Sequence, residues 1–166
     1  MSHSPIRCPG CGWPHGPSPS EAPKGLQASG ACFEAYQSLC FYTLSLSDDR
    51  FIHQHSLDTY QAQHAGAGMK NITVAFSLIG LYYALEHSFD GRQVQRVHAI
   101  LGSQKRNWES LLPAPAPMYT VTVHTVVEEK TEAGREAMLE HWMRETWTAW
   151  SHRHAWVRER TREWLG

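Results

Sequence analysis

Two cysteines close to the start of the chain constrain its fold more than any other feature. Cys8 and Cys11 stand in the pentapeptide CPGCG. The proline and glycine between the thiols favour a tight turn that aims both sulfurs at one point and lets backbone N–H groups approach them. Zinc prefers such a half-site, because thiolates at about 2.3 Å can close half of a tetrahedron. The sequence therefore predicts a zinc site, and the remaining ligands have to be found elsewhere in the chain.

Length and composition indicate one folded domain over residues 1–166. The chain is 42% hydrophobic, which is enough for a core, and its net charge is −1. A charge so close to zero gives no basic field, so we expect no bulk nucleic-acid binding. The longest apolar stretch, residues 72–85, contains Thr73, Ser77 and Gly80. We expect no membrane span, because this stretch is too short and too polar.

The number of cysteines indicates the compartment. There are four of them, and the N-terminus shows no apolar run typical of a secretory signal. We therefore expect a cytoplasmic protein with reduced thiols, in which metal binding is favoured over disulfides.

Residues 1–28 are rich in proline and glycine and show neither a helical nor a strand period. We expect an irregular N-terminal arm that a metal ties down. Residues 29–112 then form a helical core, with Ser29 as the cap of its first helix. The helices predicted from apolar spacing and turn residues are 31–45, 49–63, 71–87 and 92–103.

The last third follows a stiff segment with three prolines. Residues 119–127 alternate β-branched and polar side chains, which indicates a short strand or, for want of a strand partner, a capped short helix. Residues 132–164 are predicted to form one long helix, so residues 118–166 make up the last segment of the domain. The fold class expected is mainly α: a bundle of about five helices with an irregular, zinc-tied arm.

The connection between the first two helices suggests the other zinc ligands. A loop of two or three residues would make these helices an antiparallel hairpin, with Cys32 and His64 at the same end and the arm entering there. Cys8, Cys11, Cys32 and His64 are thus a candidate Cys3His site. Cys32 as a small buried hydrophobe and His64 as a helix cap are the simpler alternatives, and His15 is the rival fourth ligand. Cys40, about 12 Å further along its helix, is expected to be core.

A second candidate site lies in the predicted second helix and the last one. His53 and Tyr60 share a stripe with His64, and Asp58 sits in mid-helix without a capping role. His154 lies on the inward stripe of the last helix. Buried Asp and His side chains need partners, so a structural hydrogen-bond network is the simpler account. The alternative is an enzyme pocket formed by His53, Asp58, Tyr60 and His154, with an Asp58–His154 general base and with or without a second metal.

A set of residues spread over most of the chain carries a resemblance to a known family. These residues are Cys8, Cys11, Cys32, His53, Leu57, Asp58, Tyr60, Gln63, His64, the segment 78–81, Trp142, Trp147, Trp150 and His154. In them the chain resembles a bacterial family known as domain of unknown function 5946. It departs from the family at Phe33, where Trp is usual, and at Ala65, where Pro is usual. The resemblance supports the site and the fold and implies no reaction.

The leading functional hypothesis is a small zinc-binding protein whose zinc is structural, with a binding or accessory role. Four protein ligands leave no position open for water, which argues against chemistry at the metal. The last predicted helix holds five of the seven tryptophans, and Trp156 falls off its main stripe. An exposed Trp at a helix edge suggests a partner surface. A homodimer or another protein partner is the expectation for this helix.

Overall fold

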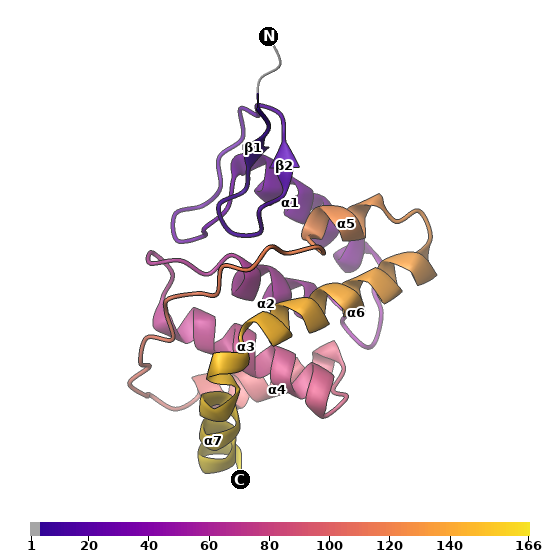
Figure 1. Cartoon of the computed structure of the whole chain (residues 1–166). Helices are drawn as coiled ribbons and strands as arrows, with labels where there is room; N and C mark the ends of the chain where they lie inside the picture. The colour runs from indigo at the N-terminus through magenta and orange to yellow at the C-terminus, as the bar shows by residue number, and fades with distance from the viewer. Residues whose placement is uncertain (1–3) are drawn as a thin grey trace.

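The computed structural model describes residues 4–166, so the first three residues of the predicted arm lie outside it. The described chain is mainly helical, as predicted, with seven α-helices and one two-stranded ribbon. Figure 1 shows the ribbon at one end of the molecule and α7 at the other. The elements are β1 (Ile6–Arg7), β2 (Pro14–His15), α1 (Gly30–Ser45), α2 (His53–Gln63), α3 (Asn71–Glu86), α4 (Gly91–Gly102), α5 (Val123–Glu128), α6 (Glu132–Ala149), a 3₁₀ turn (Ser151–Arg153) and α7 (His154–Leu165).

Helix α3 is the apolar centre of the fold. It is hydrophobic on all sides, and Val74, Leu78, Ile79 and Leu81 are fully buried. A helix of this kind has to be covered all round, and α2, α4, α6 and α7 all pack against it.

Helix α2 is central for a different reason, because most of its buried side chains are polar. It packs against α1, α3, α4 and α6. Few apolar side chains specify its position, so hydrogen bonds have to do so. Its buried polar side chains are Gln54, Ser56, Asp58, Thr59, Tyr60 and Gln63.

The prediction that the second helix begins at residue 49 was wrong. Helix α2 begins at His53, and the connection from α1 spans residues 46–52. Ser47 and Phe51 have φ values of 47° and 48°, which lie in the left-handed region and interrupt a right-handed helix. The longer loop still leaves α1 and α2 in contact.

Residues 119–127 do not form a strand. The short helix α5 occupies most of this segment, with Thr122 and Thr125 forming a capping box at its start. The described residues offer this segment no strand partner, and its buried Val123 and Val126 face helical neighbours, chiefly α1 and α6. The arm also contains more regular structure than expected, since β1 and β2 pair antiparallel, with Ile6 opposite His15.

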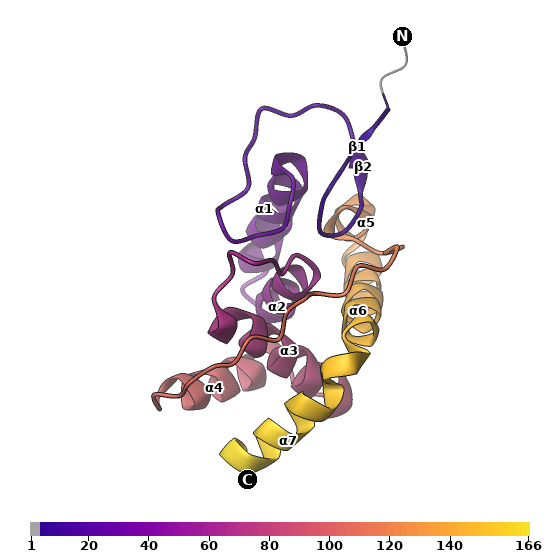
Figure 2. The same cartoon turned by 60° about the vertical axis from the view of Figure 1, so that its left-hand side comes forward.

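The single long helix predicted over 132–164 is interrupted. Helix α6 ends before Trp150, and a 3₁₀ turn separates it from α7. The axis of α7 therefore runs in a different direction from that of α6 (Figure 2). Tertiary hydrogen bonds fix the interruption: the Trp150 indole donates to the Ala62 carbonyl at 3.0 Å, and the Arg153 guanidinium donates to the Leu111 carbonyl at 3.1 Å. Within residues 4–166, no helix has the length and apolar character to cross a membrane.

Candidate metal centre

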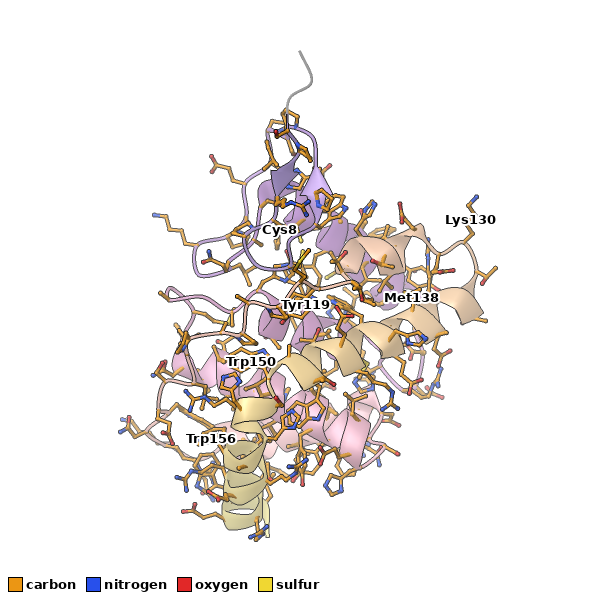
Figure 3. The ribbon with its side chains drawn as sticks, in the orientation of Figure 1. Cys8, Tyr119, Lys130, Met138, Trp150 and Trp156 are labelled. Atoms are coloured by element: carbon orange, nitrogen blue, oxygen red, sulfur yellow. The ribbon has the colours of Figure 1, made fainter. Side chains whose placement is uncertain are left out.

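The turn between β1 and β2 holds the first two cysteines. The Cys8 N–H donates to the Trp13 carbonyl and the Gly12 N–H donates to the Cys8 carbonyl, both at 2.9 Å. Gly12 has a φ of 79°, which costs glycine nothing and a larger residue about 1 kcal/mol. Figure 3 shows Cys8 at the base of the arm, where it meets the helices. The CPGCG turn thus presents two thiols toward the helical core.

Cys32 and His64 come to the same place from two helix ends. Ser29 caps α1, with its Oγ accepting from the Cys32 N–H at 3.2 Å, and its own N–H donates to the Cys8 sulfur at 3.5 Å. His64 is the C-cap of α2 and directly follows its last residue, Gln63. The backbone also ties the arm to this end, since the Gln27 N–H donates to the His64 carbonyl at 2.8 Å.

The four predicted ligands lie together as one group, the Cys3His cluster of Cys8, Cys11, Cys32 and His64. Their ligand atoms all lie within 4.8 Å of one another, and all four residues are buried, at 2% exposure or less. The Cys11 and Cys32 sulfurs are 3.8 Å apart, and the Cys32 sulfur is 3.3 Å from His64 Nε2. In a zinc tetrahedron with sulfur at about 2.3 Å and nitrogen at about 2.0 Å, these edges are about 3.8 Å and 3.5 Å. The group therefore has the dimensions of a tetrahedral metal site.

Neighbouring groups orient the ligands. His64 Nδ1 lies 2.8 Å from the Tyr60 carbonyl, which suits an Nδ1–H donor and leaves the Nε2 lone pair for a metal. The Tyr60 hydroxyl donates to the Cys32 sulfur at 3.5 Å, and its ring stacks on His64 at 4.0 Å. These contacts supply the outer shell that a bound metal ion requires.

The electrostatics of the cluster favour a cation. Hydrogen bonds from the Cys11 and Cys32 thiols hold the pKa of Cys8 far below its ordinary value. Hydrogen bonding to Cys11 and Cys8, together with burial, raises the pKa of the Cys32 thiol far above its ordinary value. Without a cation, the Cys32 thiol therefore keeps its proton beside the sulfur of Cys8. A metal ion supplies the positive charge with which all three cysteines bind as thiolates.

The other candidate ligands lie apart from this group. His15 sits on β2, with Nδ1 2.7 Å from the Gly16 carbonyl and its ring 5.1 Å from that of Trp13. Cys40 is half-buried on α1 and packs against the core, as expected. Burial raises the pKa of the Cys40 thiol, which keeps it protonated.

The residues predicted for an enzyme pocket have separate surroundings. His53 Nδ1 lies 2.9 Å from Thr43 Oγ1, and His154 Nε2 lies 2.8 Å from the Trp147 carbonyl. Tyr60 belongs to the outer shell of the Cys3His cluster. Within residues 4–166, no hydrogen bond or ion pair joins Asp58 to His154. A catalytic role for these residues stays a prediction.

Asp58 has partners that the sequence analysis missed. Its Oδ1 accepts from Gln54 at 3.1 Å, and its Oδ2, which has no hydrogen-bond partner among residues 4–166, lies 3.9 Å from His98 Nε2. His98 Nε2 is 2.9 Å from the Phe76 carbonyl, an arrangement that suits an N–H donor. Burial raises the pKa of Asp58 well above its ordinary value and lowers that of His98 to about 4. Burial thus disfavours the charged form of both groups, which fits a structural network.

His98 could have been found from the sequence. It lies on the stripe of α4 that Val94, Val97 and Leu101 bury, and a histidine on such a stripe needs a polar partner. Which partner it meets depends on how α4 packs on α2 and α3, and helical spacing alone does not give that packing.

The fold and the site together define a class of protein: a mainly α-helical chain with a buried group of three cysteines and one histidine that can hold a metal ion. A family model described as a family of unknown function (DUF5946) matches residues 6–151. The match spans most of the chain, so the chain belongs to this family. It includes all four residues of the Cys3His cluster and ends before α7. No curated protein and no solved structure matches the chain.

Proposed function

We propose that the chain is a small cytoplasmic zinc-binding protein in which zinc is structural, and that its role is binding or accessory. The observation that carries this proposal is the buried Cys3His cluster, whose ligand atoms lie within 4.8 Å of one another. Three thiolates and an imidazole at tetrahedral spacing are a donor set that suits zinc.

The structural role follows from the number of ligands and from what they connect. Four protein ligands fill a tetrahedral ion and leave no position for a substrate or a water molecule. The ligands come from the CPGCG turn, the first turn of α1 and the end of α2, which are otherwise joined by few backbone bonds. Zinc at this point would fasten the arm to the α1–α2 pair, so the metal contributes to folding rather than to a reaction.

Metal analysis of the purified chain tests the proposal. We expect about one zinc ion per chain, lost on Cys8→Ser or Cys11→Ser. Cys40→Ser is the matched control, because Cys40 lies outside the cluster, and it should retain zinc. Stoichiometric zinc in the Cys8→Ser/Cys11→Ser variant, or iron in place of zinc in the unaltered chain, would refute the assignment.

The closed coordination has its own test. Cobalt(II) in the site should show the thiolate charge-transfer bands of a four-coordinate ion. Azide should leave these bands unchanged, since no ligand position is open. A shift on adding azide would indicate an exchangeable position and would favour a catalytic metal.

A further inference from the structure

A cleft with basic residues in its lining lies beside α1, α2 and the start of α3. We call it the lysine cleft, after Lys24 and Lys70, which line it together with Phe33, Tyr36, Leu57 and Met69. Its volume is about 360 Å³, within the range of roughly 300–1,000 Å³ typical of small-molecule sites. The lining combines an apolar wall with two cationic side chains.

The charge of the lysine cleft is uncompensated. No acidic side chain lines it, and neither lysine is among the ion pairs of residues 4–166. Three other clefts are lined by carboxylates, such as Glu136 and Glu145, and a fourth by no charged side chain. The lysine cleft is therefore the one among these five that favours an anion.

The start of α3 adds to this preference. Lys70 is the N-cap of this 16-residue helix, no side chain caps it, and its first turn contains no acidic residue. The positive end of the helix dipole thus lies at Lys70, which is itself one of the residues that line the cleft. Acidic side chains are favourable in the first turn of a helix. Helix α3 has none there, so an acidic group of a ligand can take this place.

We propose that the lysine cleft binds a small organic anion, a carboxylate carried on an apolar chain or ring. The apolar part of the ligand would lie against the wall of Phe33, Tyr36, Leu57 and Met69. Binding is favoured there because hydrocarbon surface is removed from water. The carboxylate would lie at the rim between Lys24 and Lys70. A neutral ligand of the same shape lacks the second interaction, and a cation is repelled by both lysines. Two lysines are too few for the phosphate contacts of a nucleic acid.

Isothermal titration calorimetry on the full-length, metal-loaded chain tests the proposal. The probes are octanoate, 1-octanol and octylammonium, which share a chain length and differ in charge, with 4-phenylbutanoate as a carboxylate on a ring. We expect saturable binding of at least one carboxylate, and binding of 1-octanol and octylammonium at least tenfold weaker. Saturable binding of neither carboxylate, or equal affinity for octanoate and 1-octanol, would overturn the proposal.

Substitution of the two exposed lysines locates the site. Lys24→Gln/Lys70→Gln should weaken binding of the carboxylate at least tenfold. The matched control is Lys105→Gln/Lys130→Gln, which removes the other two lysines of the chain. Lys130 points away from the molecule between α5 and α6 (Figure 3), and neither control residue lines a cleft described above. Unchanged affinity in the first variant, or an equal loss in the control, would refute the assignment.

Discussion

Gly10→Ala is expected to weaken metal binding through a collision that the structure defines. A Cβ atom at Gly10 would lie 2.2 Å from the Gln27 carbonyl oxygen and 2.7 Å from Cδ2 of His64. An ordinary contact begins at 3.4 Å, so the imidazole would have to retreat by about 0.7 Å. Metal sites hold ligand distances to about 0.2 Å. The displaced His64 Nε2 would therefore no longer fit the tetrahedron that the three sulfurs define.

The size of the effect follows from two costs. Loss of the supporting geometry around a metal ligand typically reduces metal affinity 10–100-fold, and overpacking at a buried contact costs about 1–3 kcal/mol. The Gln27 carbonyl is the closest atom, and the Gln27 N–H is bonded to the His64 carbonyl. Movement of this segment would therefore disturb the backbone on both sides of the cluster. We expect zinc affinity to fall 10–100-fold while the helical content is retained.

Gly16→Ala is the matched control in the same arm. No atom of the described residues lies within 4 Å of a Cβ placed at Gly16, and the φ of Gly16 is not in the left-handed region. The assay is competition for zinc with a chromophoric chelator, with far-ultraviolet circular dichroism to follow the helices. Affinity of Gly10→Ala within twofold of that of Gly16→Ala would refute the reasoning, because it would show that the arm does not approach His64 as closely as described.

Three further predictions concern the arm and the core. Chelation of the metal should expose residues 4–28 to limited proteolysis while most of the helical circular-dichroism signal persists; loss of the whole signal would show that metal and core fold as one unit. Gly80→Ala should lower the free energy of unfolding in a urea titration by about 1–3 kcal/mol, because its Cβ would lie 1.9 Å from Asp58 Oδ2. Gly102→Ala is the control, since the nearest atom to its Cβ would be 3.9 Å away, and it should cost less than about 1 kcal/mol. Equal losses in the two variants would contradict the close packing of Gly80 on Asp58. Burial lowers the pKa of His98 from 6.5 to about 4, so the unfolded chain takes up a proton between these values that the folded chain does not. Stability should therefore fall by about 2 kcal/mol for this group as the pH drops from 7 to 5, and urea unfolding of His98→Gln at both pH values should lack this part of the loss.

The common height of Cys32 and His64 was predictable because helical rise is regular. The predicted loop between the first two helices was too short, yet Cys32 and His64 still lie at similar heights along them. Cys32 lies 13 residues before the end of α1, and His64 lies 11 residues after the start of α2. At 1.5 Å per residue, these distances are about 20 Å and 17 Å. The later start of α2 shortens only the distance of His64 from the loop, and the two heights still agree to within about 3 Å.

The features that the sequence analysis missed depend on contacts between distant segments. Helical periodicity continues through Trp150, but the helix stops there because the Trp150 indole bonds to Ala62, 88 residues earlier. The surroundings of Asp58 depend in the same way on His98, 40 residues later in the chain. Local patterns define where a helix is favoured and which face is apolar, whereas the exact partner of a buried polar group follows from the assembled fold.

Three consecutive residues at the end of α2 explain how the arm and the core are joined. The Ala62 carbonyl accepts from Trp150, the Gln63 side chain bonds to both Trp142 and the Val121 carbonyl, and His64 faces the thiols. Helix α6 and its C-cap thus hold Ala62 and Gln63, the segment before α5 also holds Gln63, and the arm meets His64, all within one turn. Buried hydrogen bonds contribute about 1 kcal/mol each and cost more when broken on one side. Removal of the metal releases only the contact at His64, while the tryptophans still hold Ala62 and Gln63. For this reason the helical core should outlast the metal, and the arm is the part whose order depends on it.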